Sequence, residues 1–358
     1  MAGIAGFFLL FFLLWAAPLK APHGGQLIRV GTMTSTRAKH SATLLYNGTV
    51  LIAGGVGNDG KLLSSAELYD PSTRKFTPTG GMTEARAAHS AVQLISGTVL
   101  IIGGLGSKGA LDSCEIYDPA SGKFLPAASL HTPRAGATAT RLQDNRVLVV
   151  GGVGPGGQSI ASAEFYDRNA NFSSAAAMSS PRSFHTATLL PHERVLIAGG
   201  VRGNEPLSSA ELYNAELNRF FALPSMSVAR VRHAAVALPG GNVLLVGGSS
   251  ANKQLGIATT EIFDLENGRF VAGGSMLQPR WGLPDPVVLS GGKVLVVGGA
   301  RIQEIYDAAK NTSAVATSTT ERFPWYQSAT LLSDGNVLVT GGSDQKGQRT
   351  AQSYIYVP

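Results

Sequence analysis

Val50-Leu-Ile-Ala-Gly-Gly55 is an aliphatic run that ends in two glycines, and this pattern decides the fold. It occurs seven times, with the first glycine of each pair at positions 54, 103, 151, 199, 247, 298 and 341. Consecutive first glycines are 49, 48, 48, 48, 51 and 43 residues apart. A unit of β-branched runs repeated about every 48 residues, without helical periodicity, predicts stacked four-stranded sheets.

Each unit divides into four expected strands, named a to d in chain order. Strand a follows an Arg-x-x-His start such as Arg37 to His40, and a tight turn such as Asn47-Gly48 leads into strand b. Strand b is the aliphatic run, which is apolar on both faces and therefore needs neighbours on both sides. Strand c carries a motif such as Glu67 to Asp70, and strand d carries an aromatic residue such as Phe76.

The double glycine, the Tyr of strand c and the aromatic residue of strand d resemble the kelch repeat. The resemblance covers nearly all of residues 25–358 and implies an all-β, seven-bladed kelch-type β-propeller of the galactose-oxidase-like superfamily. The glycines suit positions where successive sheets approach so closely that a Cβ would intrude.

The two ends of this domain belong to one expected sheet. Leu27 lies ten residues before Arg37, as Phe76 lies ten residues before Arg86, so the chain begins with a strand d. It ends at Tyr354 to Pro358, where the strand d of the last unit is due. The first strand is therefore predicted to complete the last blade and close the ring.

The N-terminal segment favours export. Residues 4–17 are 14 uncharged, apolar positions, too few for a membrane-spanning helix of about 20 residues. They match the apolar part of a signal peptide over residues 1–21, and an uncleaved short anchor or a buried core segment are the alternatives. We expect a periplasmic, cell-surface or extracellular protein that contacts a membrane only through an uncleaved segment.

Composition excludes several classes of protein. With 44% hydrophobic residues the chain is not disordered, and a single Cys excludes internal disulfides, multi-cysteine zinc sites and iron–sulfur clusters. The net charge of +6 is spread out rather than collected in a basic block, which argues against nucleic acid. No phosphate loop, dinucleotide fingerprint or nucleophile elbow occurs, so we expect no catalytic residue, metal or cofactor.

An arginine precedes strand a in six units. The six could form an anion-binding ring around the channel, or each could pair with the Glu of strand c. The seventh unit favours the structural role, because Arg322 lies two positions early and Gln352 or Ser353 replaces the Glu, so both partners are missing together. The recurring residues are Arg37, Arg86, Arg134, Arg182, Arg230 and Arg280.

Histidine and cysteine do not indicate a metal centre. One repeat position holds His40, His89, His185 and His233, with Ala137, Pro284 and Gln327 in the other units. Each strand offers one imidazole without a recurring carboxylate, which favours packing and hydrogen bonding. The copper-radical oxidases of the superfamily need a Tyr crosslinked to Cys and two His near the axis, whereas Cys114 lies on strand c and is expected to be a small buried hydrophobe.

The pattern breaks in the sixth and seventh units. Two Trp enter the connections before strand a, and the b–c connection of the sixth unit spans 5 positions (Gly299 to Glu304) against 10 to 13 elsewhere. The d–a and b–c connections share one end of the propeller, so a notch with aromatic walls and cationic rims is expected there, unless the Trp merely plug a degenerate repeat. The predicted ligand-binding residues are Arg280, Trp281, Asp285, Arg322, Trp325 and Tyr326.

These features favour an exported, monomeric, non-catalytic propeller that binds a glycan or a protein through its d–a/b–c end. The alternative is a carbohydrate-active enzyme, a sugar oxidase or an epimerase-like protein, as the kelch resemblance allows. Asp285, Arg280 and Arg322 are its off-pattern candidates, and they do not form an acid–base pair. A third possibility is an interaction hub in a larger surface assembly.

Overall fold

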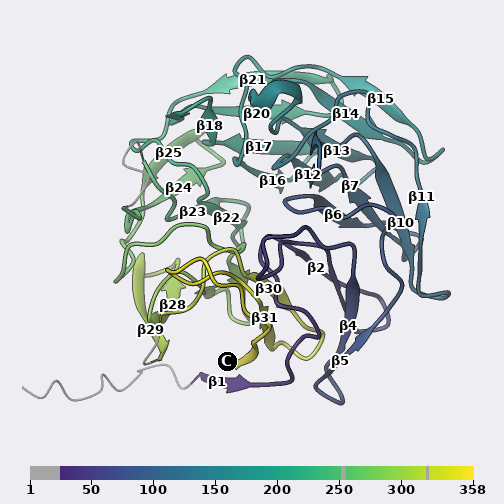
Figure 1. Ribbon diagram of the computed structural model, residues 1–358. Coiled ribbons are helices and arrows are strands. Elements are labelled where there is room, and N and C mark those ends of the chain that lie inside the picture. Colours follow the sequence, from purple (N-terminus) through teal and green to yellow (C-terminus); the bar gives the residue numbers. More distant parts are fainter. Residues whose placement is uncertain (1–24, 251–254, 320–321) are drawn as a thin grey trace, which may run out of the picture.

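A computed structural model describes residues 25–250, 255–319 and 322–358. Seven four-stranded antiparallel sheets surround a common axis as the blades of a propeller (Figure 1). The one helix in these ranges is a short 3-10 turn at Pro155–Gly157, and no helix there is long and apolar enough to cross a membrane. The predicted signal segment, residues 1–21, lies outside the described residues.

The blades follow one another along the chain, and within each blade the strands run in the order a to d from the axis outward. Blade 1 holds β2 (Ser41–Leu44), β3 (Val50–Ala53), β4 (Ala66–Asp70) and β5 (Lys75–Pro78). Blade 2 holds β6 (Ser90–Gln93), β7 (Val99–Ile102), β10 (Cys114–Asp118) and β11 (Lys123–Pro126). Blade 3 holds β12 (Thr138–Arg141), β13 (Val147–Val150), β14 (Ala163–Tyr166) and β15 (Phe172–Ala175). Blade 4 holds β16 (Thr186–Leu190), β17 (Arg194–Ala198), β20 (Ala210–Asn214) and β21 (Arg219–Leu223).

The remaining blades complete the circle. Blade 5 holds β22 (Ala234–Ala237), β23 (Val243–Val246), β24 (Thr260–Asp264) and β25 (Arg269–Ala272). Blade 6 holds β26 (Val287–Val288), β27 (Val294–Val296), β28 (Ile302–Asp307) and β29 (Thr312–Ser318). Blade 7 holds β30 (Ser328–Leu331), β31 (Val337–Thr340), β32 (Ser353–Val357) and β1 (Gln26–Arg29). Two small ribbons lie in b–c connections: β8 (Leu105–Gly106) with β9 (Gly109–Ala110), and β18 (Val201–Arg202) with β19 (Glu205–Pro206).

The core consists of the b strands, whose side chains point alternately to the two neighbouring blades. In β3, Leu51 and Ala53 pack with Val99 of blade 2, whereas Val50 and Ile52 pack toward blade 7. All four residues of β3 are buried. This explains why the aliphatic runs lack a polar face, as their continuous hydrophobicity predicted.

The N-terminal strand closes the ring, as predicted from the two chain ends. β1 pairs antiparallel with β32, with Leu27 opposite Tyr356 and Ile28 opposite Ile355. Figure 1 shows β1 beside the C-terminus, so the first and last segments of the domain share one sheet. β1 therefore covers the outer edge of β32 and serves as strand d of blade 7.

A second closure lies at the axis, at the d–a/b–c end. Seven residues with φ between +50° and +61°, one before each strand a, form a closed ring of backbone hydrogen bonds. Each N–H donates to the carbonyl of the corresponding residue in the preceding blade, at N···O distances of 2.8 to 3.3 Å. The ring consists of Lys39, Ala88, Gly136, Phe184, Arg232, Gly282 and Tyr326. It places these seven residues side by side around the channel.

The double glycines occupy close approaches between blades, as expected. Gly103 has a φ of +55°, and a Cβ there would lie 2.5 Å from the carbonyl oxygen of Arg134, in the connection to the next blade. The residue therefore needs both the left-handed backbone and the missing side chain.

Gly103→Ala is expected to lower the free energy of unfolding by about 2 kcal/mol or more, because a Cβ disfavours the left-handed region and would overlap the Arg134 carbonyl. Urea unfolding measures this loss. Gly60→Ala is the control, since Gly60 has a φ of +78° and open space around its Cβ position. Equal losses in the two variants would contradict the role of the close approach.

Candidate functional site

The six recurring arginines are buried in ion pairs within their own blades. Arg37 Nη2 lies 2.7 Å from Glu67 Oε1, and its Nη1 donates to the carbonyls of Gly54 and Ser65 at 2.8 and 3.1 Å. Glu67 Oε2 also accepts the Thr34 backbone N–H at 2.6 Å, so the pair holds the incoming d–a connection against strands b and c. The other pairs are Arg86–Glu115, Arg134–Glu164, Arg182–Glu211, Arg230–Glu261 and Arg280–Glu304.

This arrangement gives the guanidinium groups no access to the channel. Arg37, Arg86, Arg182 and Arg230 are 0% exposed. Arg280, included among the ligand-binding residues on sequence grounds, is 1% exposed and donates to Glu304 and to the carbonyls of Gly298 and Ile302. The structure places its guanidinium inside blade 6, paired with Glu304.

Blade 7 lacks both members of this pair. Tyr354 pairs with Val339 as Glu67 pairs with Ile52, so a tyrosine stands at the glutamate position. The expectation of Gln352 or Ser353 there was wrong, because β32 begins only at Ser353 and Gln352 corresponds to Ser65. The Pro324 carbonyl accepts the Gly299 N–H as the Arg86 carbonyl accepts the Gly55 N–H, so proline replaces the arginine.

The recurring histidines link neighbouring blades. His89 Nε2 lies 2.9 Å from Ser41 Oγ of blade 1, and His185 Nε2 lies 2.9 Å from Thr138 Oγ1 of blade 3. His40 and His233 make the same kind of bond to Thr340 and Thr186. Burial lowers the pKa of His40, His89 and His185 to about 3, so these imidazoles are neutral at physiological pH.

In the sixth unit this histidine position holds Leu283 rather than the expected Pro284. The bond from the Gly282 N–H to the Arg232 carbonyl fixes the register of blade 6. Leu283 Cδ1 lies 3.0 Å from the position that a Cβ on Gly247 would take. His233 Cε1 lies 2.8 Å from the equivalent position on Gly199, so Leu283 takes the place of the histidine in blade 6. The irregular Gly-Leu-Pro-Asp-Pro stretch concealed this one-residue shift.

The aromatic residues of the predicted notch lie together. The Trp281 and Trp325 rings stack with centroids 5.3 Å apart, and Trp281 meets Tyr326 edge-on at 5.8 Å. A Cβ on Gly299, in the shortened b–c connection of blade 6, would lie 3.2 Å from Trp325 Cδ1. The Arg322 guanidinium lies 5.8 Å from the Trp325 ring centroid, so it belongs to the same cluster.

Two cations of the axial ring complete this cluster, and the sequence analysis did not identify them. Arg232 lies 5.1 Å from the Phe184 ring and 5.9 Å from the rings of Trp281 and Tyr326. Lys39 Nζ lies 4.9 Å from the Tyr326 centroid. Both occupy the second x of the Arg-x-x-His motif, directly before the histidine, where the residue type changes from unit to unit. This variability within an otherwise regular repeat was the sequence signal that could have identified Lys39 and Arg232 as candidate binding residues.

These ring residues surround a cavity of about 280 Å³ at the channel entrance, which we call the axial mouth. Lys39, Phe184, Arg232 and Tyr326 contribute to its lining. The ion pairs of the described residues involve neither Lys39 nor Arg232. Burial, followed by the charges of Arg232 and Arg349, lowers the pKa of Lys39. The axial mouth is thus an electropositive cavity with aromatic walls.

Asp285 lies deeper in the channel. A second cavity of about 280 Å³ is lined by Asp285 together with Ser41, Thr43 and Ser328 of the innermost strands. The Asp285 side chain is exposed to the channel but surrounded by the blades, and this desolvation raises its pKa. Arg322 is not among the described residues that line this cavity, whereas Gln327 lines both this cavity and the one to which Arg322 contributes.

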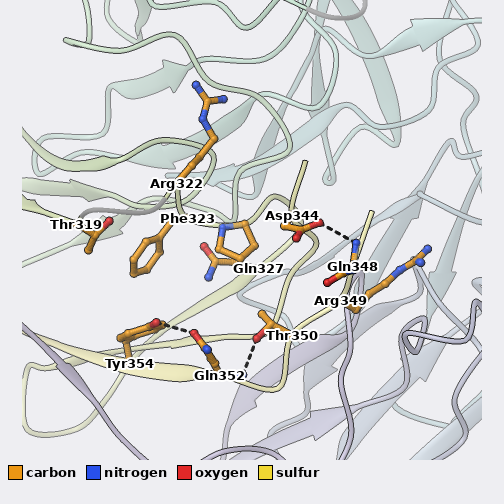
Figure 2. A pocket seen from close by; sticks show the side chains of 11 residues that line it. Thr319, Arg322, Phe323, Gln327, Asp344, Gln348, Arg349, Thr350, Gln352 and Tyr354 are labelled. Carbon is orange, nitrogen blue, oxygen red and sulfur yellow. Dashed lines mark hydrogen bonds between the residues drawn. The ribbon is translucent and has the colours of Figure 1, made fainter. Parts of the chain in front are cut away.

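The third cavity, of about 430 Å³, lies in blade 7 (Figure 2) and is called the blade-7 cavity. Its described lining comes from the d–a connection before β30, from the b–c connection before β32 and, through Tyr354, from β32 itself. The residues that matter below are Arg322, Phe323, Gln327, Arg349, Gln352 and Tyr354. Gln327 also lines the axial mouth, so the two cavities adjoin.

A copper-radical centre does not fit these residues. No group of three or more His, Cys, Asp and Glu side chains within the described ranges could hold a metal ion. Cys114 is buried on β10, where desolvation raises its pKa to about 11, and the buried histidines each use Nε2 for a hydroxyl of another blade. The donor set of the oxidases is thus not assembled at the axis.

Known proteins resemble this chain in fold. The family model described as the Kelch motif matches residues 37–83 and 86–131, which correspond to blades 1 and 2. No curated protein matches. A novel fungal alcohol oxidase of the AA5 family, solved in complex with copper, is 15% identical over 93% of this chain and 76% of its own, with a TM-score of 0.76. Together with the sevenfold repeat, these findings show that the chain is a kelch-repeat protein folded as a seven-bladed β-propeller.

Proposed function

We propose that this protein is an exported binding module that captures an acidic glycan at the axial mouth. The observation that carries the proposal is the pairing of Lys39 and Arg232 with aromatic rings in a cavity whose described lining residues include no carboxylate. An incoming anion would relieve the repulsion between these cations, and the rings offer apolar faces to sugars. Sugars that carry carboxylates, such as uronic acids, combine both properties.

Binding agrees with the chemistry of the channel better than catalysis does. The axial mouth holds neutral, buried imidazoles, and the neighbouring channel cavity contributes one carboxyl group, Asp285. An epimerase-like reaction needs a paired acid and base. The apolar N-terminal segment supports export, which would bring the propeller into contact with surface polysaccharides.

Titration calorimetry with a galacturonic acid trisaccharide tests the proposal, and the neutral galactose trisaccharide is the matched ligand. We expect the acidic ligand to bind at least about tenfold more tightly, with an affinity that falls as salt screens the cations. Equal affinity for the two ligands would overturn the acidic class. Binding of an acidic peptide but of neither trisaccharide would identify a protein ligand instead.

Arg232→Ala is expected to weaken binding of the acidic trisaccharide about tenfold or more, because Arg232 is one of the two cations of the mouth and lies beside the rings of Phe184 and Tyr326. The matched control is Arg219→Ala, which removes an exposed arginine lying 5.2 Å from the Phe221 ring on the outer strand β21. Equal affinities of Arg232→Ala and the unaltered protein in calorimetry would contradict the axial site.

A further inference from the structure

The blade-7 cavity exists because one blade has lost its ion pair. In the other six blades a guanidinium and a carboxylate fill the space between the d–a connection and strands b and c. In blade 7 the cavity is lined by Pro324, Gln352 and Tyr354, the residues at the positions of that arginine, its serine partner and the glutamate. The space that an ion pair fills in six blades is therefore a cavity in blade 7.

Among the described residues, the cavity is lined by one buried amide oxygen without a hydrogen-bond partner and by two polar side chains that bond to each other. Gln327 is 6% exposed, and its Oε1 makes no hydrogen bond within the described structure. Figure 2 shows Gln327 near the centre of the view, with Tyr354 and Gln352 on one side. The Tyr354 hydroxyl donates to Gln352 Oε1 at 2.8 Å. A buried amide oxygen without a donor is costly, and a ligand hydroxyl would satisfy it.

The charges of the lining select the class of ligand. Among the described lining residues, Arg322 and Arg349 carry two positive charges and Asp344 carries one negative charge, and Asp344 Oδ1 already accepts the backbone N–H groups of Lys346 and Gln348. Because Tyr354 replaces the glutamate, a guanidinium guest would find no carboxylate at that position. The lining therefore suits a neutral or acidic polyhydroxy ligand, and the paired rings of Phe323 and Tyr354, 5.0 Å apart, add an apolar wall.

We infer that the blade-7 cavity is a subsite for one sugar ring of the acidic glycan, an inference that rests on the function proposed above. Gln327 lines both this cavity and the axial mouth, so one oligosaccharide can occupy both. One ring lies against Gln327, Gln352 and Phe323, while a carboxylate of another unit lies near Lys39 and Arg232. The protein should thus prefer oligosaccharides to single sugars.

The test fills the blade-7 cavity with the arginine–glutamate pair that the other six blades contain. The double variant Pro324→Arg/Tyr354→Glu introduces the ion pair of the other six blades, and the affinities for galacturonic acid and its trisaccharide are compared by calorimetry. The unaltered protein should bind the trisaccharide about tenfold more tightly than the monosaccharide, and the double variant should reduce this ratio to about two or less. Gln352→Met, which removes the amide at similar size, should lower the ratio about threefold, and it decides the matter if the double variant does not fold.

The control is Gln158→Met, in the exposed b–c connection of blade 3, which should leave the ratio unchanged. An unchanged ratio in both cavity variants would overturn the subsite and leave the proposed function standing. Binding that is lost in the cavity variants but unaffected by Arg232→Ala would instead overturn the axial mouth and keep the subsite. Failure of the unaltered protein to bind either ligand would overturn both.

Discussion

Glu211→Ala is expected to lower the free energy of unfolding by about 3–5 kcal/mol, because it leaves the Arg182 guanidinium buried without its counter-ion. Arg182 is 0% exposed, and its Nη2 lies 3.0 Å from Glu211 Oε1. Burial lowers the pKa of Arg182, and the charge of Glu211 opposes this shift. Glu211 Oε2 also accepts the Ser179 N–H at 2.8 Å, so the substitution releases the d–a connection as well.

Urea unfolding of Glu211→Ala and of the double variant Arg182→Met/Glu211→Leu separates the ion pair from the volume it fills. Replacing both charges by apolar side chains of similar size removes the unpaired charge, so the double variant should lose much less stability than the single one. A single variant that loses less than about 1 kcal/mol would show that water or a neighbouring group compensates Arg182.

The features that sequence alone predicted correctly are those encoded locally and repeated seven times. The double glycines and aliphatic runs fix the number of blades, and the ten-residue spacing from Leu27 to Arg37 reveals the closing strand before any tertiary contact is known. Each of these signals rests on backbone conformation or on period-two burial. Both properties are set by residue type.

The features that the sequence could not show depend on the exact strand register and on which side chains face the central channel. The irregular stretch from Gly282 to Pro286 concealed Leu283, and without a glutamate in blade 7 nothing marked the register of Tyr354 before its pairing with Val339 was known. Lys39 and Arg232 lie at a position without a consensus, and nothing local indicates that its backbone ring turns these residues toward the channel. Arg280 looked available because a repeat pattern does not reveal how completely a side chain is buried.

A chain that begins at Val30, and therefore lacks β1, is expected to melt roughly 5–8 °C below one that begins at Gly25. Four residues of β1 pair with β32, and Leu27 packs beside Tyr356 and Val339 in the core of blade 7. With about 1 kcal/mol for each of the four lost pairings, and a shift of about 1.5 °C per kcal/mol for a domain of this size, strand pairing alone accounts for about 6 °C. The chain beginning at Gly25 is the matched control, because it retains every described strand.

The loss should extend beyond blade 7, because each b strand packs on two neighbours and the seam supports blades 1 and 6 from either side. Without β1 the outer edge of β32 offers unpaired N–H and carbonyl groups, which favours association between molecules. A synthetic peptide of residues 25–31 should restore the melting temperature by adding the missing strand in trans, whereas a scrambled peptide should not. If the shortened chain melts within about 2 °C of the control, the ring is held by its axial hydrogen bonds and blade packing, and strand closure is dispensable.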